Sequence, residues 1–199
     1  MEMKIKKFEE LSKIVPILTY QRLADENTIV VSVDKLSFAL KCLKLHFGYQ
    51  YHMLSCISGV DFLGKDYRFS VVYDLLSLTF NTRLRVKVFV NEVTSVPSCV
   101  DTFINANWWE REVWDLYGVY FDKHPDLRRI LTDYGFEGHP LRKDFPLTGH
   151  SEVRYSEDQK KVISEPVKLE QNYRNFDYES PWEGTKYIKE EIESNDKKN

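Results

Sequence analysis

The residues best suited to chemistry gather in one stretch, residues 110–144. A predicted helix carries Glu110, Arg111, Glu112 and Asp115 within six positions. The sequence after it adds further charged and titratable residues: His124, Asp126, Arg128, Arg129, Asp133, Glu137, His139, Arg142, Lys143 and Asp144. Such a cluster could perform acid–base catalysis, bind a metal ion or form a structural ion network.

Acid–base catalysis would use Glu112 and Asp115 as paired carboxylates, or Glu112 together with His124 in a hydrolase. The alternative is that these carboxylates accept hydrogen bonds from arginines and fix the geometry of loops. No Ser or Cys lies in a sequence context typical of an activated nucleophile. We therefore favour the structural interpretation and keep the hydrolase as an alternative.

A metal site would have to use His124, His139 and His150, which are fifteen and eleven residues apart. These spacings match no compact zinc pattern, and His124 and His139 each precede a proline, as is typical of turns. A phosphate site is also not indicated, because no glycine-rich loop follows a strand and opens a helix. The sequence predicts no metal or phosphate site.

The chain has three cysteines, Cys42, Cys56 and Cys99, and none forms a Cys-x-x-Cys pair. An odd number at wide spacing argues against a disulfide framework and indicates a reducing compartment. It also argues against an iron–sulfur cluster held by this chain alone, since such clusters normally take four ligands, mostly cysteines. We expect no cofactor bound by the chain itself.

Composition indicates a globular protein of 199 residues with 42% apolar residues and a net charge of -3. No stretch approaches the roughly 20 apolar residues of a membrane helix, and no secretion or transit signal is recognisable. Arg83, Arg85 and Lys87 alternate along one predicted strand and leave a nucleic-acid-binding module as a second alternative. We prefer a solvated sheet face or an interface with an acidic neighbour.

The N-terminal half is predicted to alternate helices and strands. Apolar residues at helical spacing favour a helix over residues 6–20, with Pro16 inside it as a potential early stop. A β-branched run predicts a strand over residues 27–34. Asp34 is the predicted N-cap of a helix over residues 35–47, and Gly48 is its predicted end.

Three antiparallel strands are predicted next, over residues 51–62, 67–76 and 82–91. The last alternates, with Leu84, Val86, Val88 and Val90 on the apolar side. A third helix is predicted over residues 107–118, with Asn107 and Glu110 as a capping box and Gly118 as its end. This order predicts the α+β class: a mostly antiparallel sheet of about four strands, with helices on one face and a long extended C-terminal arm.

The domain prediction is an α+β domain over residues 1–145, an extended aromatic arm over 146–189 and a disordered tail over 190–199. Regular periodicity fades after Val119, and prolines punctuate the remainder. The arm is too aromatic for a typical disordered segment. We expect it to lie on a surface, and Phe176 and Trp182 are its candidate contacts with a partner.

The stretch from Glu110 to Asp144 resembles a known signature. Glu110-Arg111-Glu112, Asp115-Leu116-Tyr117, His124 and Arg128-x-Ile130-Leu131 look like the respiratory complex I 30 kDa subunit family, also called NADH dehydrogenase subunit 9. Residues 134–149, 152–155 and 172–184 resemble that family too. The match is close over about 104–184 and looser over 20–103.

The resemblance implies a non-catalytic core subunit of the peripheral arm of NADH:ubiquinone oxidoreductase, the H+-translocating complex I, with no catalysis by the isolated chain. FMN, iron–sulfur clusters and ubiquinone would lie in partner subunits. The implied partners are other peripheral-arm subunits, chiefly the quinone-site (49 kDa-type) subunit, with no nucleic acid, no membrane insertion and no homo-oligomer. The expected location is the matrix side of the mitochondrial inner membrane, or the cytoplasmic side of a bacterial inner membrane.

Under that resemblance, the candidate residues take structural or interface roles, with Glu112 and Asp115 holding Arg128, Arg129 or Arg142. The full set is Glu110, Arg111, Glu112, Asp115, His124, Arg128, Arg129, His139, Arg142, Lys143, Asp144, Phe176 and Trp182.

Overall fold

The computed structural model describes residues 11–23, 26–171, 174 and 176. The chain divides into two units, residues 1–149 and residues 150–199. In the first unit the elements are β1 (Ile17–Leu23), β2 (Glu26–Val31), the 3-10 helix η1 (Val33–Lys35), α2 (Leu36–Leu45), β3 (Met53–Asp61), β4 (Phe69–Ser77), β5 (Thr82–Val90), β6 (Val96–Pro97), α3 (Ala106–Tyr117) and β7 (Phe121–Asp122).

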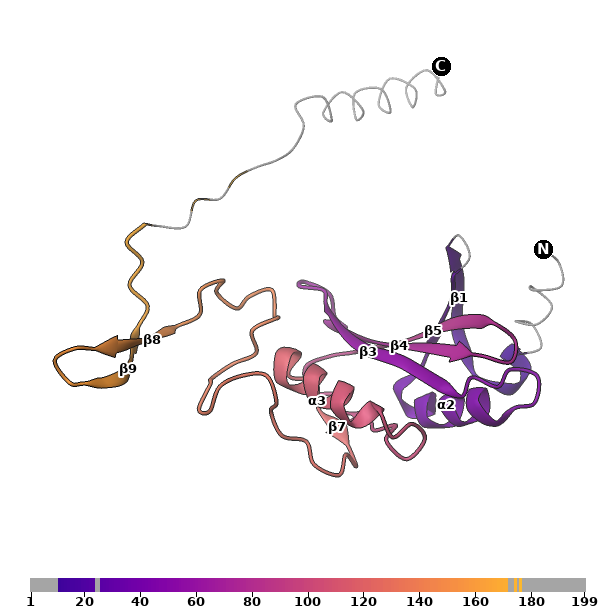
Figure 1. Cartoon of the computed structure of the whole chain (residues 1–199). Coiled ribbons are helices and arrows are strands. Elements are labelled where there is room, and N and C mark those ends of the chain that lie inside the picture. The colour runs from indigo at the N-terminus through magenta and orange to yellow at the C-terminus, as the bar shows by residue number, and fades with distance from the viewer. Residues whose placement is uncertain (1–10, 24–25, 172–173, 175, 177–199) are drawn as a thin grey trace, which may run out of the picture. The chain divides into compact units, whose positions relative to one another are not determined.

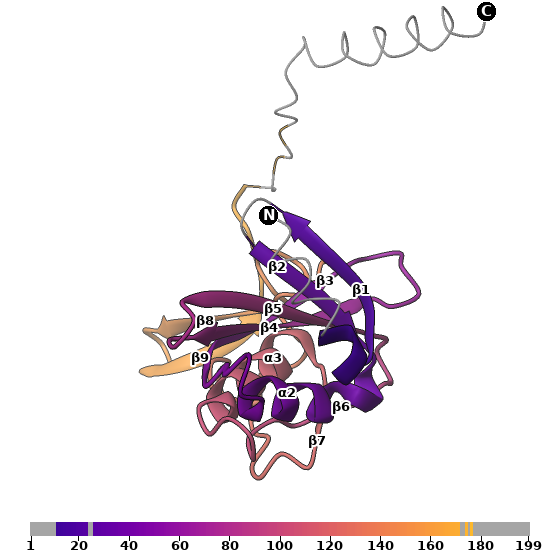
Figure 2. The same ribbon diagram turned by 90° about the vertical axis from the view of Figure 1, so that its right-hand side faces the viewer.

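The main sheet has five strands in the order β1-β2-β5-β4-β3. Neighbouring strands are antiparallel except for β2 and β5, which are parallel. The helices α2 and α3 lie on the same face of this sheet (Figures 1 and 2). The α+β class, the mostly antiparallel sheet and the placement of the helices are confirmed.

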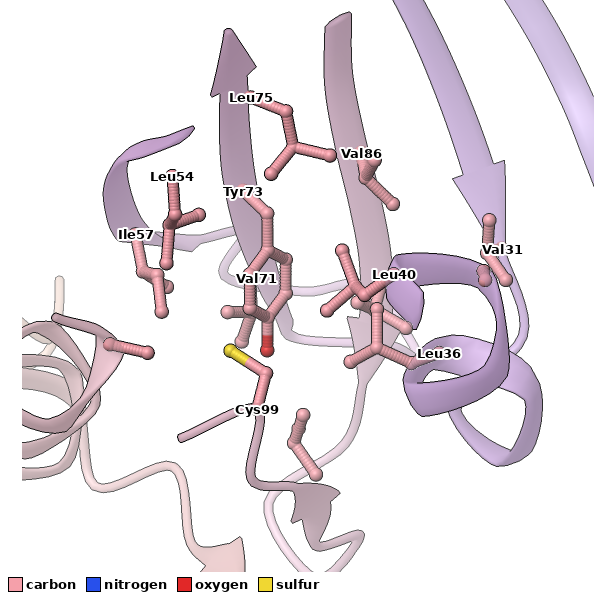
Figure 3. Packing of buried hydrophobic residues seen from close by; sticks show 14 of the residues in the cluster. Val31, Leu36, Leu40, Leu54, Ile57, Val71, Tyr73, Leu75, Val86 and Cys99 are labelled. Atoms are coloured by element: carbon pink, nitrogen blue, oxygen red, sulfur yellow. The ribbon is translucent and has the colours of Figure 1, made fainter. Parts of the chain in front are cut away.

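The core lies between the sheet and the two helices. Strand β4 sends Val71, Tyr73 and Leu75 toward α2, which contributes Leu36 and Leu40 (Figure 3). The alternation predicted for the third antiparallel strand is confirmed, since the side chains of Leu84, Val86, Val88 and Val90 are all buried. Burial of these large side chains at roughly 25 cal/mol per Å² of apolar area is the main stabilising contribution to the fold.

The predicted helix over residues 6–20 is wrong in its second half. Only residues 11–14 are helical within the described part, and β1 begins at Ile17. Pro16 explains the change, because proline has no N–H to continue the helix and its ring clashes with the preceding turn. Leu18 lies on β1 and is 65% exposed. The new strand raises the sheet from four strands to five.

Three predicted helix boundaries also need correction. Helix α2 has Lys35 rather than Asp34 at its N-cap, because η1 precedes it, and it ends at Leu45 before Gly48. Helix α3 has Asn105 at its N-cap, with no side-chain capping bond, so the capping box of Asn107 and Glu110 is wrong. The predicted end at Gly118 is confirmed, with φ at 76°.

Helix α3 packs closely on β3 at Gly59. A Cβ built on Gly59 would lie 2.6 Å from the ring of Tyr117, so any side chain there would collide with α3. Gly59 pairs with Val71 and therefore points to the helix-covered face of the sheet. This contact sets how close the helix lies to the sheet.

The second unit contains a two-stranded antiparallel hairpin, β8 (Ser151–Ser156) and β9 (Lys161–Pro166). This stretch was expected within an extended arm, and no hairpin was predicted there. An ion pair between Arg154 and Glu165 joins the two strands. The predicted tail over residues 190–199 lies outside the described residues, and the arm over 146–189 remains a prediction.

Replacing Gly59 with Val tests the packing of α3 on β3. The added methyl groups must displace the ring of Tyr117, and we expect a loss of about 2–3 kcal/mol in the free energy of unfolding, measured by denaturant titration. Ser58→Val adds similar bulk to the exposed neighbour on the opposite face of β3 and should change the stability by less than about 0.5 kcal/mol. Equal midpoints for the two variants would contradict the packing described here.

Candidate functional site

Glu110 ties the start of α3 to the loop before it. Its side chain is fully buried, and its carboxylate accepts hydrogen bonds from the backbone N–H of Cys99 at 2.7 Å and the hydroxyl of Ser98 at 2.6 Å. A buried carboxylate is stable only when such donors compensate its lost hydration. Burial and the Glu110 carboxylate together raise the pKa of the Cys99 thiol. The thiol points into the core near Tyr73 (Figure 3).

His124 lies on the other side of Glu110, and the His124 side chain is also fully buried. Its Nδ1 accepts a hydrogen bond from the backbone N–H of Asp126, with 3.1 Å between the two nitrogens. The ring proton therefore sits on Nε2, which donates to the carbonyl of Asn107 at 3.2 Å. Nε2 lies 3.9 Å from the nearer Glu110 oxygen. His124 thus joins β7 and the loop after it to the first turn of α3.

Asp115 holds the loop that follows β7. Its fully buried carboxylate accepts hydrogen bonds from three successive backbone N–H groups, those of Ile130 at 3.2 Å, Leu131 at 2.8 Å and Thr132 at 3.0 Å. The hydroxyl of Thr132 adds a fourth bond at 2.7 Å. Consecutive N–H groups that converge on one point form an anion-binding nest. Here the anion in the nest is the Asp115 carboxylate itself.

Asp115 stays ionised because of these donors. Burial acts to raise the pKa of Asp115. The hydrogen bonds from the Thr132 side chain and from the three backbone groups lower it by a larger amount in total, so the net pKa falls below the ordinary value. The Arg129 guanidinium lies 3.7 Å away, too far for a strong ion pair. The predicted pairing of Asp115 with Arg129 is therefore only a long contact, and backbone groups do most of the holding.

A second loop, residues 139–142, covers the C-terminal end of α3. The carbonyls of Asp115, Leu116 and Tyr117 accept hydrogen bonds from His139 Nδ1 at 2.9 Å, the backbone N–H of Leu141 at 3.1 Å and Arg142 Nε at 2.7 Å. Carbonyls in the last turn of a helix have no partner within the helix, and a cation there is favoured by the helix dipole. This loop supplies both the donors and the cation.

Gly118 makes this approach possible. It has φ at 76°, and a Cβ on it would lie 2.5 Å from the guanidinium of Arg142 and 2.6 Å from the ring of His139. The close contact and the left-handed backbone both require glycine. Burial lowers the pKa of His139, the bond to the Asp115 carbonyl opposes this, and the nearby cations Arg142 and Arg129 lower the pKa further, so that it falls below the ordinary value.

A network that the sequence did not predict connects the same loop to the sheet. Asp61 is fully buried at the end of β3, and its carboxylate binds Arg68 at 2.9 and 3.1 Å and the backbone N–H of Lys143 at 2.7 Å. Arg68 also pairs with Asp144 at 2.6 Å and with Glu92. A sequence signal existed: Asp61 interrupts an otherwise uncharged predicted strand, which is unusual unless the charge is paired.

The remaining candidate residues differ in their contacts. Arg111 is buried, donates to the carbonyl of Arg128 at 3.0 Å, and stacks on the ring of Trp108. Arg128 pairs with the exposed Asp126, and Lys143 takes part through its backbone alone. In the described part of the chain Glu112 makes no ion pair with Arg128, Arg129 or Arg142, so that prediction is wrong. Phe176 contacts the Arg174 guanidinium, and Trp182 lies outside the described residues.

Taken together, α3 is clamped by three segments: the turn at 98–99, the loop at 128–132 and the loop at 139–144. Each buried carboxylate in this clamp accepts hydrogen bonds from donors of the same chain, two at Glu110, three at Asp61 and four at Asp115, and these bonds hold it in a fixed position. Over the described residues, no group of three His, Cys, Asp or Glu side chains is placed to hold a metal ion. The arrangement is suited to rigidity.

Asp115→Asn tests the nest through its pH dependence. The pKa of Asp115 is lower in the folded protein than in the unfolded chain, where it is about 3.9. The stabilisation that the Asp115 carboxylate gives to the fold is therefore fully present above pH ~3.9 and is lost as the pH falls through the folded-state pKa. We expect the variant to be about 2 kcal/mol less stable than wild type at pH 7, with the gap shrinking below pH ~4. Denaturant titrations across pH would measure it, with the exposed Asp158→Asn as control. A gap that is constant down to pH ~2 would refute this account.

Arg68→Leu tests the second network. It leaves the buried Asp61 carboxylate without its cation, and we expect a loss of about 3 kcal/mol in the free energy of unfolding. Arg128→Leu is the matched control, because Arg128 pairs with Asp126 in solvent and such pairs contribute about 0–1 kcal/mol. Thermal or denaturant unfolding would compare the two. Similar losses in both variants would show that Arg68 has no special role.

Comparison with known proteins gives a consistent family. Residues 29–151 match the family described as the respiratory-chain NADH dehydrogenase 30 Kd subunit. An NADH-quinone oxidoreductase subunit of Methylobacterium radiotolerans is 56% identical over 163 residues, which cover 82% of this chain and 76% of that protein. NADH-ubiquinone oxidoreductase subunit 9 of Reclinomonas americana is 54% identical over 167 residues, covering 84% and 82%.

A solved structure supports the fold. A chain of the membrane-bound sulfane sulfur reductase, an archaeal respiratory membrane complex, superposes with a TM-score of 0.63 over 81% of this chain and 99% of its own length, at 23% identity. None of the helices in the described residues is long and apolar enough to cross a membrane. The family match begins within β2 and covers β3, β4, β5 and all three segments of the clamp, and the chain belongs to the 30 kDa subunit family of the respiratory-chain NADH dehydrogenase.

Proposed function

We propose that this chain is a cofactor-free structural subunit in the peripheral arm of NADH:quinone oxidoreductase, where the clamped helix α3 and its loops form a rigid platform beside the quinone-site (49 kDa-type) subunit. The observation that carries the proposal is that the buried carboxylates of Glu110, Asp115 and Asp61 are all hydrogen-bonded by donors of the same chain. Side chains engaged in this way fix geometry, and they are not available to react with a substrate.

The cysteines favour the absence of a resident cluster. Iron–sulfur clusters normally take four ligands, mostly cysteines, and the chain has three cysteines in all. In the described residues Cys42, Cys56 and Cys99 belong to no group of three His, Cys, Asp or Glu side chains placed to hold a metal ion. Flavin, clusters and quinone are therefore assigned to partner subunits.

The clamped loops offer a surface for a partner. Leu131, Tyr134 and Leu147 are large apolar side chains, and all three are exposed on the segment that Asp115, His139 and Arg142 hold in place. Exposed apolar side chains on rigid loops are typical of protein–protein contacts, because little conformational entropy is lost on binding. This favours a permanent neighbour such as the quinone-site subunit.

The location proposed for the chain is the matrix side of the mitochondrial inner membrane, with the cytoplasmic side of a bacterial inner membrane as the alternative. Similar proteins occur in Methylobacterium radiotolerans and in Reclinomonas americana. Attachment to the membrane would come through other subunits of the complex.

The two alternative functions lack support in the site. The hydrolase needs Glu112 beside His124, but His124 lies against Glu110 instead. The nucleic-acid module needs a free basic face, but Arg85 is paired with Asp74 at 2.8 Å and with Glu26 at 3.0 Å. Both alternatives are set aside.

Native electrophoresis with an in-gel NADH dehydrogenase stain tests the proposal. The wild-type chain should co-migrate with a very large NADH-oxidising assembly. Asp115→Asn should reduce the amount of that assembly while leaving NADH:quinone turnover per assembled complex unchanged, because the residue supports geometry only. A variant that assembles in normal amount but has lost turnover would overturn the scaffold assignment.

A further inference from the structure

The exposed side of α3 carries large apolar side chains that do not belong to the clamp. Ile104, just before the helix, is 86% exposed, and Trp108 is 64% exposed. Both line a shallow hollow of about 640 Å³, together with Asn105, Asn107, Arg111 and Asp126. Glu112 follows Trp108 by one turn on the same side of the helix. We call Ile104, Trp108 and Glu112 the Trp108 surface.

Trp108 is held in position although it is exposed. The guanidinium of Arg111 lies 4.8 Å from the centre of its ring, a cation–π contact. Arg111 is itself buried and fixed by its bond to the carbonyl of Arg128 at 3.0 Å. An exposed tryptophan with a fixed orientation loses little entropy when it is covered, and tryptophan is enriched among residues that dominate binding energy.

Glu112 is the exception among the carboxylates of α3. Glu110 and Asp115 are hydrogen-bonded by donors of this chain, whereas Glu112 is half-buried and has no hydrogen bond or ion pair among the described residues. Burial is the main cause that raises the pKa of Cys56 and Tyr117, and Glu112 raises it further, but neither group carries a positive charge. A carboxylate partly removed from water favours a cation beside it.

We propose that the Trp108 surface binds a segment of a neighbouring subunit, one in which an arginine or lysine lies next to a large apolar side chain. The cation pairs with Glu112, and the apolar side chain fills the hollow between Ile104 and Trp108. Charge selects this occupant, since the unpaired group is acidic and its apolar neighbours are exposed. A second copy of the chain fits poorly, because a two-fold contact centred here would bring two Glu112 carboxylates together.

The test rests on the proposed function and is made in the assembled complex. Glu112→Lys should reduce the stained NADH-oxidising assembly about tenfold through like-charge repulsion, and Trp108→Ala and Glu112→Gln should reduce it to a smaller extent. The thermal unfolding midpoint of each purified chain should match that of wild type. Asp66→Lys and Phe47→Ala, at exposed positions away from this surface, are matched controls that should assemble normally.

A photo-crosslinking residue at position 108 then identifies the occupant. The expected product joins position 108 to a segment of another subunit that contains a basic residue, and reversing that residue to Glu should restore assembly with Glu112→Lys. Crosslinking to a second copy, or to a segment without a basic residue, would overturn the proposal. So would normal assembly of both Glu112→Lys and Trp108→Ala.

The two proposals fail separately. If the wild-type chain does not co-migrate with an NADH-oxidising assembly, the proposed function is wrong. If wild type co-migrates and all Trp108-surface variants do so equally, only the inference about this surface is wrong. Should Glu112→Lys lower the unfolding midpoint, Glu112→Gln, which preserves shape, decides the outcome.

Discussion

The burial of one carboxylate constrains the rest of this structure. Asp115 lies in the last turn of α3 with no access to water, so its charge must be balanced by donors within the chain. Three successive N–H groups of the 130–132 segment supply that balance, which forces this segment into a convergent turn against the helix. The two neighbouring anchors, at Glu110 and at the C-terminal carbonyls of α3, then fix the helix at both ends.

Much of the fold could be predicted from the sequence because the relevant signals are local. The alternation from Leu84 to Val90 and the glycine at 118 each depend on neighbouring residues, and both are confirmed. At the N-terminus a helical pattern competes with strand formation, and Pro16 decides the outcome in favour of β1. The parallel pairing of β2 with β5 depends on how distant strands meet, and no local pattern carries that information.

The candidate site could be predicted in its membership but not in its pairing. Glu110, Asp115, His124, His139 and Arg142 do meet around α3, yet the partners of Asp115 and Arg142 are mostly backbone groups, which no side-chain pattern can reveal. Arg68 and Asp61 escape prediction because they lie far from the signature in sequence and contact it only through the fold. Glu112 was expected to hold an arginine because arginines are abundant nearby, and in the described structure it holds none.

The bond from the backbone of Lys143 to Asp61 joins residues that are 82 positions apart. Contacts of such high sequence separation close a large loop before they return any stabilisation, and they therefore form late in folding. During synthesis the sheet and α3 emerge from the ribosome before residues 139–144 do. Until then Asp61 lacks the backbone N–H of Lys143 and the last carbonyls of α3 lack their donors, so the closed clamp distinguishes a chain that has finished folding from one that has not. A neighbour that recognises the clamped loops would thereby select mature chains and avoid incorporating nascent ones.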